Sequence, residues 1–103
     1  MSIVSDILQD ELKRLRKLEQ KYLTQIKKLP LGSISLKKRG SQEYAYLAYR
    51  KDSKVKFDYL GRSDSDSVQD LSAQIQERKK YEKLLKKVSG DIMEIEKAIK
   101  SGK

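Results

Sequence analysis

The feature that most constrains this chain is a change in the spacing of its apolar residues. Between residues 2 and 29 they recur every three or four positions, as on one face of an α-helix. Between residues 33 and 60 they alternate with polar residues, which is the period of a β-strand. The helical spacing returns at residue 68 and continues to about residue 100. These periods predict a helix, a group of strands and a second helix, in that order.

The ends of the two helices carry recognisable signals. Pro30 disfavours helical geometry at the residue before it, so the first helix is expected to end at residue 29. Residues 63–67 are serine and aspartate only, and they are expected to form a polar linker that caps the second helix. Asp66 with Gln69, or Ser67 with Asp70, has the spacing of a capping box.

The second helix contains one weak point. Gly90 lies within residues 89–91, and glycine costs about 1 kcal/mol relative to alanine inside a helix. A kink or a break of the helix at this position is one expectation, and a continuous helix through residue 100 is the other.

Residues 30–62 are expected to form a three-stranded antiparallel meander with strands at 33–37, 43–50 and 54–60. A hairpin that turns on Asp52 and Ser53 pairs Tyr46 with Tyr59. One side of this hairpin then carries mostly apolar residues and is expected to pack on a helix; its members are Tyr44, Tyr46, Ala48, Val55, Phe57 and Tyr59. The opposite side carries Ala45, Leu47, Tyr49, Lys54, Lys56 and Asp58.

The expected fold is therefore α+β: two long antiparallel helices, as a helical hairpin or coiled coil, flank the three-stranded antiparallel β-meander in a single domain of residues 1–103. Residues at helical spacing are expected to form the helix–helix seam, which also suits pairing with a second copy or a helical partner protein. These residues are Leu8, Leu15, Leu18, Tyr22, Leu71, Leu85, Ile92 and Ile99.

Composition excludes several kinds of chemistry. The chain has no cysteine and no histidine, so disulfides, thiol nucleophiles and histidine metal ligands are absent. Its five glycines are scattered, and no glycine-rich phosphate loop is present. We therefore expect no enzyme activity, no metal, no cofactor and no small-molecule substrate. No apolar run is long enough to cross a bilayer, so the expected setting is the cytoplasm without membrane contact.

Positive charge is concentrated in the middle of the chain. The formal net charge is +9, and residues 30–62 hold eight basic and three acidic residues. A basic sheet with interleaved tyrosines is typical of a DNA- or RNA-binding surface, because cations neutralise phosphates and aromatic rings stack on exposed bases. The candidate nucleic-acid-binding residues are Lys37, Lys38, Arg39, Tyr49, Arg50, Lys51, Lys54, Lys56 and Arg62.

Two other interpretations stay open. In the first, the strand aromatics other than Tyr49 are core residues, because they alternate with polar residues as buried strand residues do. The lysines at the turns are then ordinary solvent-exposed residues that bind nothing. The chain can also act as a coiled-coil scaffold or inhibitor through protein–protein contacts of its helices, most simply as a homodimer. The first hypothesis is a small nucleic-acid-binding accessory protein of a mobile element, and the second is this interaction protein.

Two resemblances concern the middle segment. The segments Pro30 to Ile34, Tyr44 to Arg50 and Lys54 to Gly61 resemble a pattern of small uncharacterised bacterial and archaeal proteins with helices on both sides of a sheet. Residues 32–34 and 37–40, with the tyrosine-rich strand after them, are similar to the arm-binding domain of phage tyrosine integrases. That resemblance implies a sheet that docks on DNA, with Lys37, Lys38 and Arg39 beside its first turn.

Overall fold

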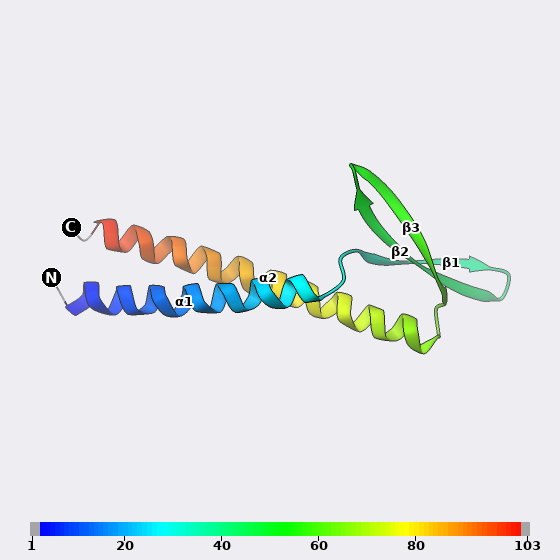
Figure 1. Cartoon of the computed structure of the whole chain (residues 1–103), viewed down its shortest axis with the longest axis horizontal. Helices are drawn as coiled ribbons and strands as arrows, with labels where there is room; N and C mark the ends of the chain where they lie inside the picture. The colour runs from blue at the N-terminus through cyan, green and yellow to red at the C-terminus, as the bar shows by residue number, and fades with distance from the viewer. Residues whose placement is uncertain (1–2, 102–103) are drawn as a thin grey trace. The chain divides into compact units, whose positions relative to one another are not determined.

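The computed structural model describes residues 3–101 and has five elements (Figure 1). They are α1 (Ile3–Lys28), β1 (Ser33–Arg39), β2 (Gln42–Lys51), β3 (Lys54–Arg62) and α2 (Asp66–Ser101). The expected α+β arrangement, with two helices flanking a three-stranded antiparallel sheet in the chain, is confirmed. The chain forms two compact units: α1 with α2 from Lys80 onwards, and the segment Leu29–Lys79.

In the first unit, α1 and the later part of α2 pack side by side and run antiparallel (Figure 1). Leu15, Val88 and Ile92 are buried between them, with Leu18 and Tyr22 packed against this cluster. Burial of such side chains supplies about 1.5–3 kcal/mol each, which makes this narrow seam the main source of stability for the helix pair.

Polar contacts continue the seam in the same antiparallel order. The guanidinium of Arg16 lies 3.1 Å from the carboxylate of Glu96, and the hydroxyl of Ser89 donates to Glu19 at 3.3 Å. Further along, the rings of Tyr22 and Tyr81 lie 5.9 Å apart. Of the expected seam residues, Leu15 and Ile92 are fully buried, and the others are half-buried: Leu8, Leu18, Tyr22, Leu71, Leu85 and Ile99.

The second helix is not broken at its glycine. Helical structure is continuous from Asp66 to Ser101, and it includes Ser89, Gly90 and Asp91. Of the two expectations for this region, the structure has the uninterrupted helix. Packing of Val88 and Ile92 against α1, on either side of Gly90, offsets the intrinsic cost of that glycine.

The second unit contains the sheet, with strand order β1–β2–β3. The expected turn is confirmed: Asp52 and Ser53 both have positive φ, at 53° and 67°, as a two-residue hairpin loop requires. The predicted register is also confirmed, because Tyr46 pairs with Tyr59 and Ala48 with Phe57. A bulge follows at Ala45 and Tyr46 and shifts the last two pairs of the ladder.

The face of the sheet that packs on a helix is the one not expected. Ala45 is completely buried, whereas Phe57 and Tyr59 are 52% and 61% exposed. Ile34 and Leu36 of β1 share the face of Ala45, and they line one hollow together with residues of the first turns of α2, Val68 among them. The prediction that the tyrosine-bearing side covers a helix is therefore wrong. Small and aliphatic side chains line the covered side, and the aromatic side stays in solvent.

The start of α2 is capped differently from either expected pair. The hydroxyl of Ser65 accepts from the backbone N–H of Val68 at 3.4 Å, and the Gln69 N–H donates to the carbonyl of Ser65. The side-chain amide of Gln69 also donates to the carbonyl of Ser63 at 3.1 Å. Ser65 is thus the N-cap residue, and the capping boxes predicted at Asp66 and Ser67 are wrong by one or two positions.

Gly32 should be far less tolerant of substitution than Gly90. Gly32 has φ +123°, and a Cβ there would lie 2.6 Å from the carbonyl oxygen of Ala48, whereas a Cβ at Gly90 meets nothing within 4 Å. Gly32→Ala should lower the free energy of unfolding by about 1–3 kcal/mol. Gly90→Ala should raise it by about 0.5–1 kcal/mol. Urea unfolding followed by circular dichroism measures both, and equal effects of the two changes would contradict the prediction.

Candidate nucleic-acid interface

One side of the sheet gathers aromatic and basic residues, and we call it the aromatic face. It is the side turned away from the buried Ala45, and the strand registers assign its members. They are Ser33, Ser35, Lys37 and Arg39 of β1; Gln42, Tyr44, Tyr46, Ala48 and Arg50 of β2; and Val55, Phe57, Tyr59 and Arg62 of β3.

The rings on this face form a connected group. The centroid of Tyr59 lies 5.4 Å from that of Tyr46, nearly edge-to-face, and 6.2 Å from that of Tyr44. Tyr44 and Tyr46 are half-buried on the central strand, whereas Phe57 and Tyr59 stand on the edge strand and are more than half exposed. Mutual packing holds the rings in place without covering their outer surfaces.

A single lysine joins the basic and aromatic parts of the face. The ammonium nitrogen of Lys37 lies 5.1 Å from the ring centroid of Tyr46 and 5.3 Å from that of Phe57. Both distances are within the range of a cation–π interaction. Lys37 therefore crosses from β1 over the central strand to β3, and its charge is positioned directly at the rings.

The structure divides the nine predicted binding residues between the two sides of the sheet. Lys37, Arg39, Arg50 and Arg62 lie on the aromatic face. The other five lie on the helix-side face, which is the side of Ala45: Lys38, Tyr49, Lys51, Lys54 and Lys56. No single flat surface can therefore contact all nine.

The two faces differ in their acidic residues. Among the described strand residues, the aromatic face holds no aspartate or glutamate, whereas the helix-side face holds Glu43 and Asp58. Arg62 is paired with Asp64 of the following loop at 3.2 Å, with both side chains exposed, so this ion pair is weak. The aromatic face has the larger uncompensated positive charge.

The phenol of Tyr49 has a specific polar partner. Its hydroxyl lies 3.3 Å from the carboxylate of Asp58 and donates a hydrogen bond to it. Partial burial and the negative charge of Asp58 raise the pKa of this phenol above its ordinary value of 10.0. Tyr49 therefore belongs to a local contact on the helix-side face.

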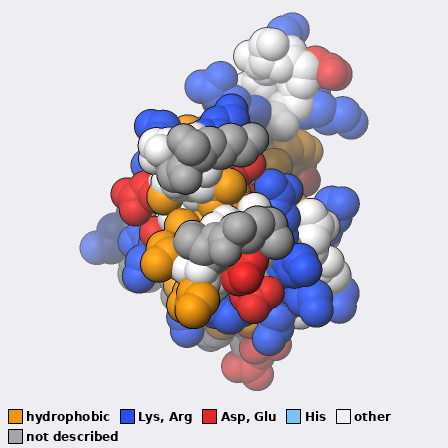
Figure 2. Space-filling model, turned by 90° about the vertical axis from the view of Figure 1, so that its left-hand side faces the viewer, with side chains coloured by type: hydrophobic (Ala, Val, Ile, Leu, Met, Phe, Trp, Pro, Cys, Tyr) orange, Lys and Arg blue, Asp and Glu red, His pale blue; other side chains and the backbone are white. Residues whose placement is uncertain are grey.

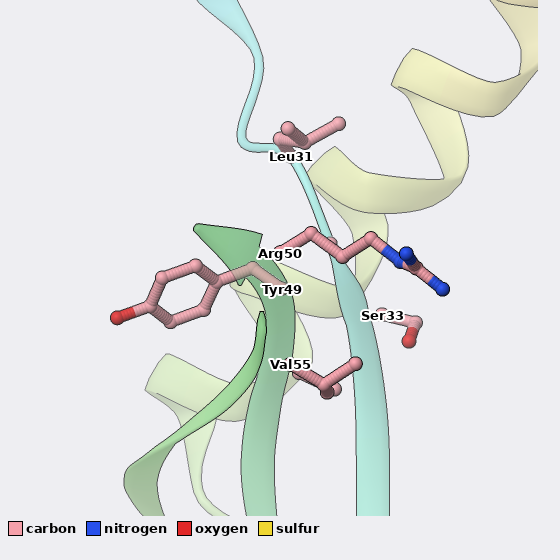
Figure 3. Close-up of a pocket in the computed structure, with 7 residues that line it drawn as sticks. Leu31, Ser33, Tyr49, Arg50 and Val55 are labelled. Atoms are coloured by element: carbon pink, nitrogen blue, oxygen red, sulfur yellow. The ribbon is translucent and has the colours of Figure 1, made fainter. Parts of the chain in front are cut away.

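The aromatic face continues into a shallow hollow at one end (Figure 3). Its volume is about 480 Å³, and Leu31, Gly32, Ala48 and Val55 form most of its apolar lining. Figure 3 shows Arg50 and Tyr49 leaving β2 in opposite directions, with Arg50 on the side of Ser33. The hollow thus places a guanidinium group beside an apolar surface that no large side chain fills.

A second exposed apolar surface lies in the other unit, at the end of the helix pair. Ile3, Val4 and Ile7 of α1 are 60–78% exposed, and Met93 of α2 is 59% exposed. Figure 2 views this end and shows hydrophobic side chains at the surface among lysine and arginine side chains. Met93 also lines a small hollow with Glu96, Lys97 and Lys100.

Two other types of site are absent from residues 3–101. No group of three or more aspartate, glutamate, histidine or cysteine side chains is arranged to hold a metal ion there. No helix in the same range is long and apolar enough to cross a bilayer.

Comparison with known protein families gives one match. The family described as a domain of unknown function, DUF6788, matches residues 8–70, which is more than half of the chain. The chain belongs to the DUF6788 family. No curated protein and no solved structure matches it.

The DUF6788 match includes the whole aromatic face, whose apolar side chains were expected to pack on a helix. Tyr44, Tyr46, Phe57 and Tyr59 are the residues missed as surface candidates. A signal was present in the first strand, because Ile34 and Leu36 share a face with Ala45 and Leu47. The expectation rested on the second hairpin alone, where the aromatic side has more apolar area.

Asp58 should control the ionisation of Tyr49. Because the pKa of Tyr49 is raised, folding favours the neutral phenol, and this stabilisation is present below pH 10.0 and lost as the pH rises through the folded-state pKa. Asp58→Asn should lower that pKa, since it removes the negative charge beside the hydroxyl. Ultraviolet absorbance titration measures it, and the Tyr49→Phe variant identifies the transition that belongs to Tyr49. An unchanged transition in Asp58→Asn would contradict the assignment.

Proposed function

We propose that this protein binds nucleic acid through the aromatic face of its sheet. One observation carries the proposal: four aromatic side chains and four lysine or arginine residues share a surface that holds no carboxylate among the described strand residues. A polyanion gains from each cation that neutralises a phosphate, and nearby carboxylates reduce that gain. The helix-side face has as many basic residues but also two carboxylates.

One of the two sequence resemblances supports the same partner. The basic turn at residues 37–40 is similar to the arm-binding domain of phage tyrosine integrases, a sheet that docks on DNA. We accordingly propose that this chain is a cytoplasmic accessory protein of a bacterial or archaeal mobile element. In this role it binds nucleic acid and catalyses no reaction. Lys37 and Arg50 are the residues on which we base the test, because both lie on the aromatic face.

Charge reversal on the aromatic face should weaken binding more than the same reversal on the other face. Lys37→Glu with Arg50→Glu lowers the net charge by the same amount as Lys54→Glu with Lys56→Glu, so general electrostatic attraction falls equally in both. Fluorescence anisotropy with labelled DNA and RNA, single- and double-stranded, should show at least a tenfold loss for the first variant at about 150 mM salt. The control should lose less than about threefold.

The salt dependence gives a second measure of the same interface. The slope of log affinity against log salt concentration should become shallower by about 0.7–0.9 for each phosphate contact that the Lys37 and Arg50 changes remove. Equal losses in the two paired variants would show that net charge alone, and not the aromatic face, attracts nucleic acid.

A second candidate function is association with a second copy through the helix pair. The exposed side chains of Ile3, Val4 and Ile7, which lie close together at the start of α1, support it, because exposed apolar side chains that are neighbours on a surface can mark an interaction site. Charge complementarity favours a copy of the same chain: α1 has Asp6 and Asp10 near its start, and α2 has Lys97 and Lys100 near its end. A two-fold pair that sets α1 against α2 of the partner brings opposite charges together.

Ile7→Glu should convert this dimer to a monomer. Leu31→Glu is the matched control, because Leu31 is 59% exposed, close to the 60% of Ile7, and lies in the other unit. Multi-angle light scattering should give the dimer mass for the unchanged protein and for Leu31→Glu, and the monomer mass for Ile7→Glu. A monomer mass for the unchanged protein at every concentration tested would exclude the dimer.

A further inference from the structure

We propose that the aromatic face takes an unpaired strand of nucleic acid, with bases stacked on Phe57 and Tyr59, in preference to a duplex. This inference rests on the proposed function and states which form of nucleic acid the face recognises. Its basis is the exposure of the two edge-strand rings, which are 52% and 61% accessible although apolar surface of this size is normally buried.

An exposed aromatic ring can stack only on a base whose own flat surface is exposed. In a duplex, each base is covered on both flat surfaces by its neighbours in the stack, so Phe57 and Tyr59 have no free surface to contact. An unpaired base offers both surfaces, and stacking on an aromatic side chain is worth roughly five- to 150-fold in affinity per base. The charges of the face would attract a single strand and a duplex alike, whereas its exposed rings favour the single strand.

The spacing of the rings fits an extended strand. Phe57 and Tyr59 are two residues apart on β3, which sets their backbone positions about 6.6 Å apart. This is about twice the spacing of nucleotides in a stacked strand, which is about 3.4 Å. Bases on the two rings are therefore separated from each other, as they are in a strand that has been pulled open.

The cations lie where the phosphates of such a strand would pass. Lys37 is held over the rings of Tyr46 and Phe57 at 5.1 and 5.3 Å, and an arriving base can displace it toward the neighbouring phosphate. At the other end of the face, Arg50 stands at the hollow between Val55 and Leu31, where the strand can continue. The ring surfaces therefore have a basic group on either side.

The charge of the face also argues against two other occupants. A second copy that packed its own aromatic face here would bring Lys37, Arg39 and Arg50 against the same groups, and like charges repel at close range. An acidic peptide would satisfy the cations but would leave the flat ring surfaces without stacking partners. The polyglutamate competition described below tests the acidic peptide.

The chain has no tryptophan, so Phe57→Trp introduces a single fluorescent reporter on the face. Its emission should be quenched by oligo(dT) and oligo(U) of about 20 nucleotides, which exceed the roughly 4–16 nucleotides that a small sheet domain occupies. A duplex of the same length should bind at least tenfold more weakly and leave the emission unchanged. Polyglutamate should neither quench the reporter nor compete with the oligonucleotides at about 150 mM salt.

Removing the rings without changing charge gives the decisive comparison. Phe57→Leu with Tyr59→Leu should weaken oligo(dT) and oligo(U) binding at least tenfold and leave duplex binding within about twofold. Tyr49→Leu, the same kind of change on the helix-side face, should leave both unaffected. Circular dichroism and a thermal melt establish that each variant is folded.

Failure of this inference differs from failure of the proposed function. If the leucine variant binds single strands normally, or if duplex binds as tightly as single strands, the preference for unpaired bases is overturned while the loss caused by Lys37→Glu with Arg50→Glu still stands. If polyglutamate competes equally, the face is a general acidic-peptide site and the inference is overturned. If no nucleic acid binds even at low salt, both proposals fail together.

Discussion

The complete burial of Ala45 is the constraint on which the sheet depends. Ala45 lies on the central strand, and on the same face Ile34 and Leu36 of β1 share a hollow with the buried Val68 of α2. A larger side chain at this fully buried position would have no room without a shift of its neighbours. Since a strand presents alternate residues to opposite sides, the burial of Ala45 also decides that Tyr44 and Tyr46 face the other way. The exposure of the aromatic face goes with the burial of Ala45 on the opposite side.

The elements and the strand register could be predicted because they depend on local signals. The period of the apolar residues identifies both helices, and the Asp52–Ser53 turn sets the pairing of Tyr46 with Tyr59. The covered face could not be predicted in the same way, since both sides of the sheet carry apolar residues. What decides between them is which side is covered in the folded chain: Ala45 is buried, whereas Phe57 and Tyr59 are exposed. The cap of α2 was misplaced for a related reason: residues 63–67 are all capable N-caps, and only the course of the chain after β3 selects Ser65.

The candidate site could be predicted from the sequence only in part. Basic composition pointed to the meander, and four of the nine proposed residues lie on the aromatic face. The other five lie on the opposite side with Glu43 and Asp58, so a count of charges along the chain overstated the size of the binding surface. The aromatic residues were assigned to the core because large rings are usually buried. Charge along a sequence identifies a segment, whereas the division between faces requires the sheet.

The edge strand β3 has a consequence for how the protein behaves in solution. Its sequence alternates Lys54, Val55, Lys56 and Phe57, so each exposed apolar residue on one side is followed by a charge on the other. An uncovered edge with free backbone groups is a template for addition of strands from other molecules, and lysines on that edge oppose it by repulsion. High salt, or acetylation of Lys54 and Lys56, would remove this protection and favour fibrous aggregates. The lysines on the helix-side face thus keep the molecule dispersed.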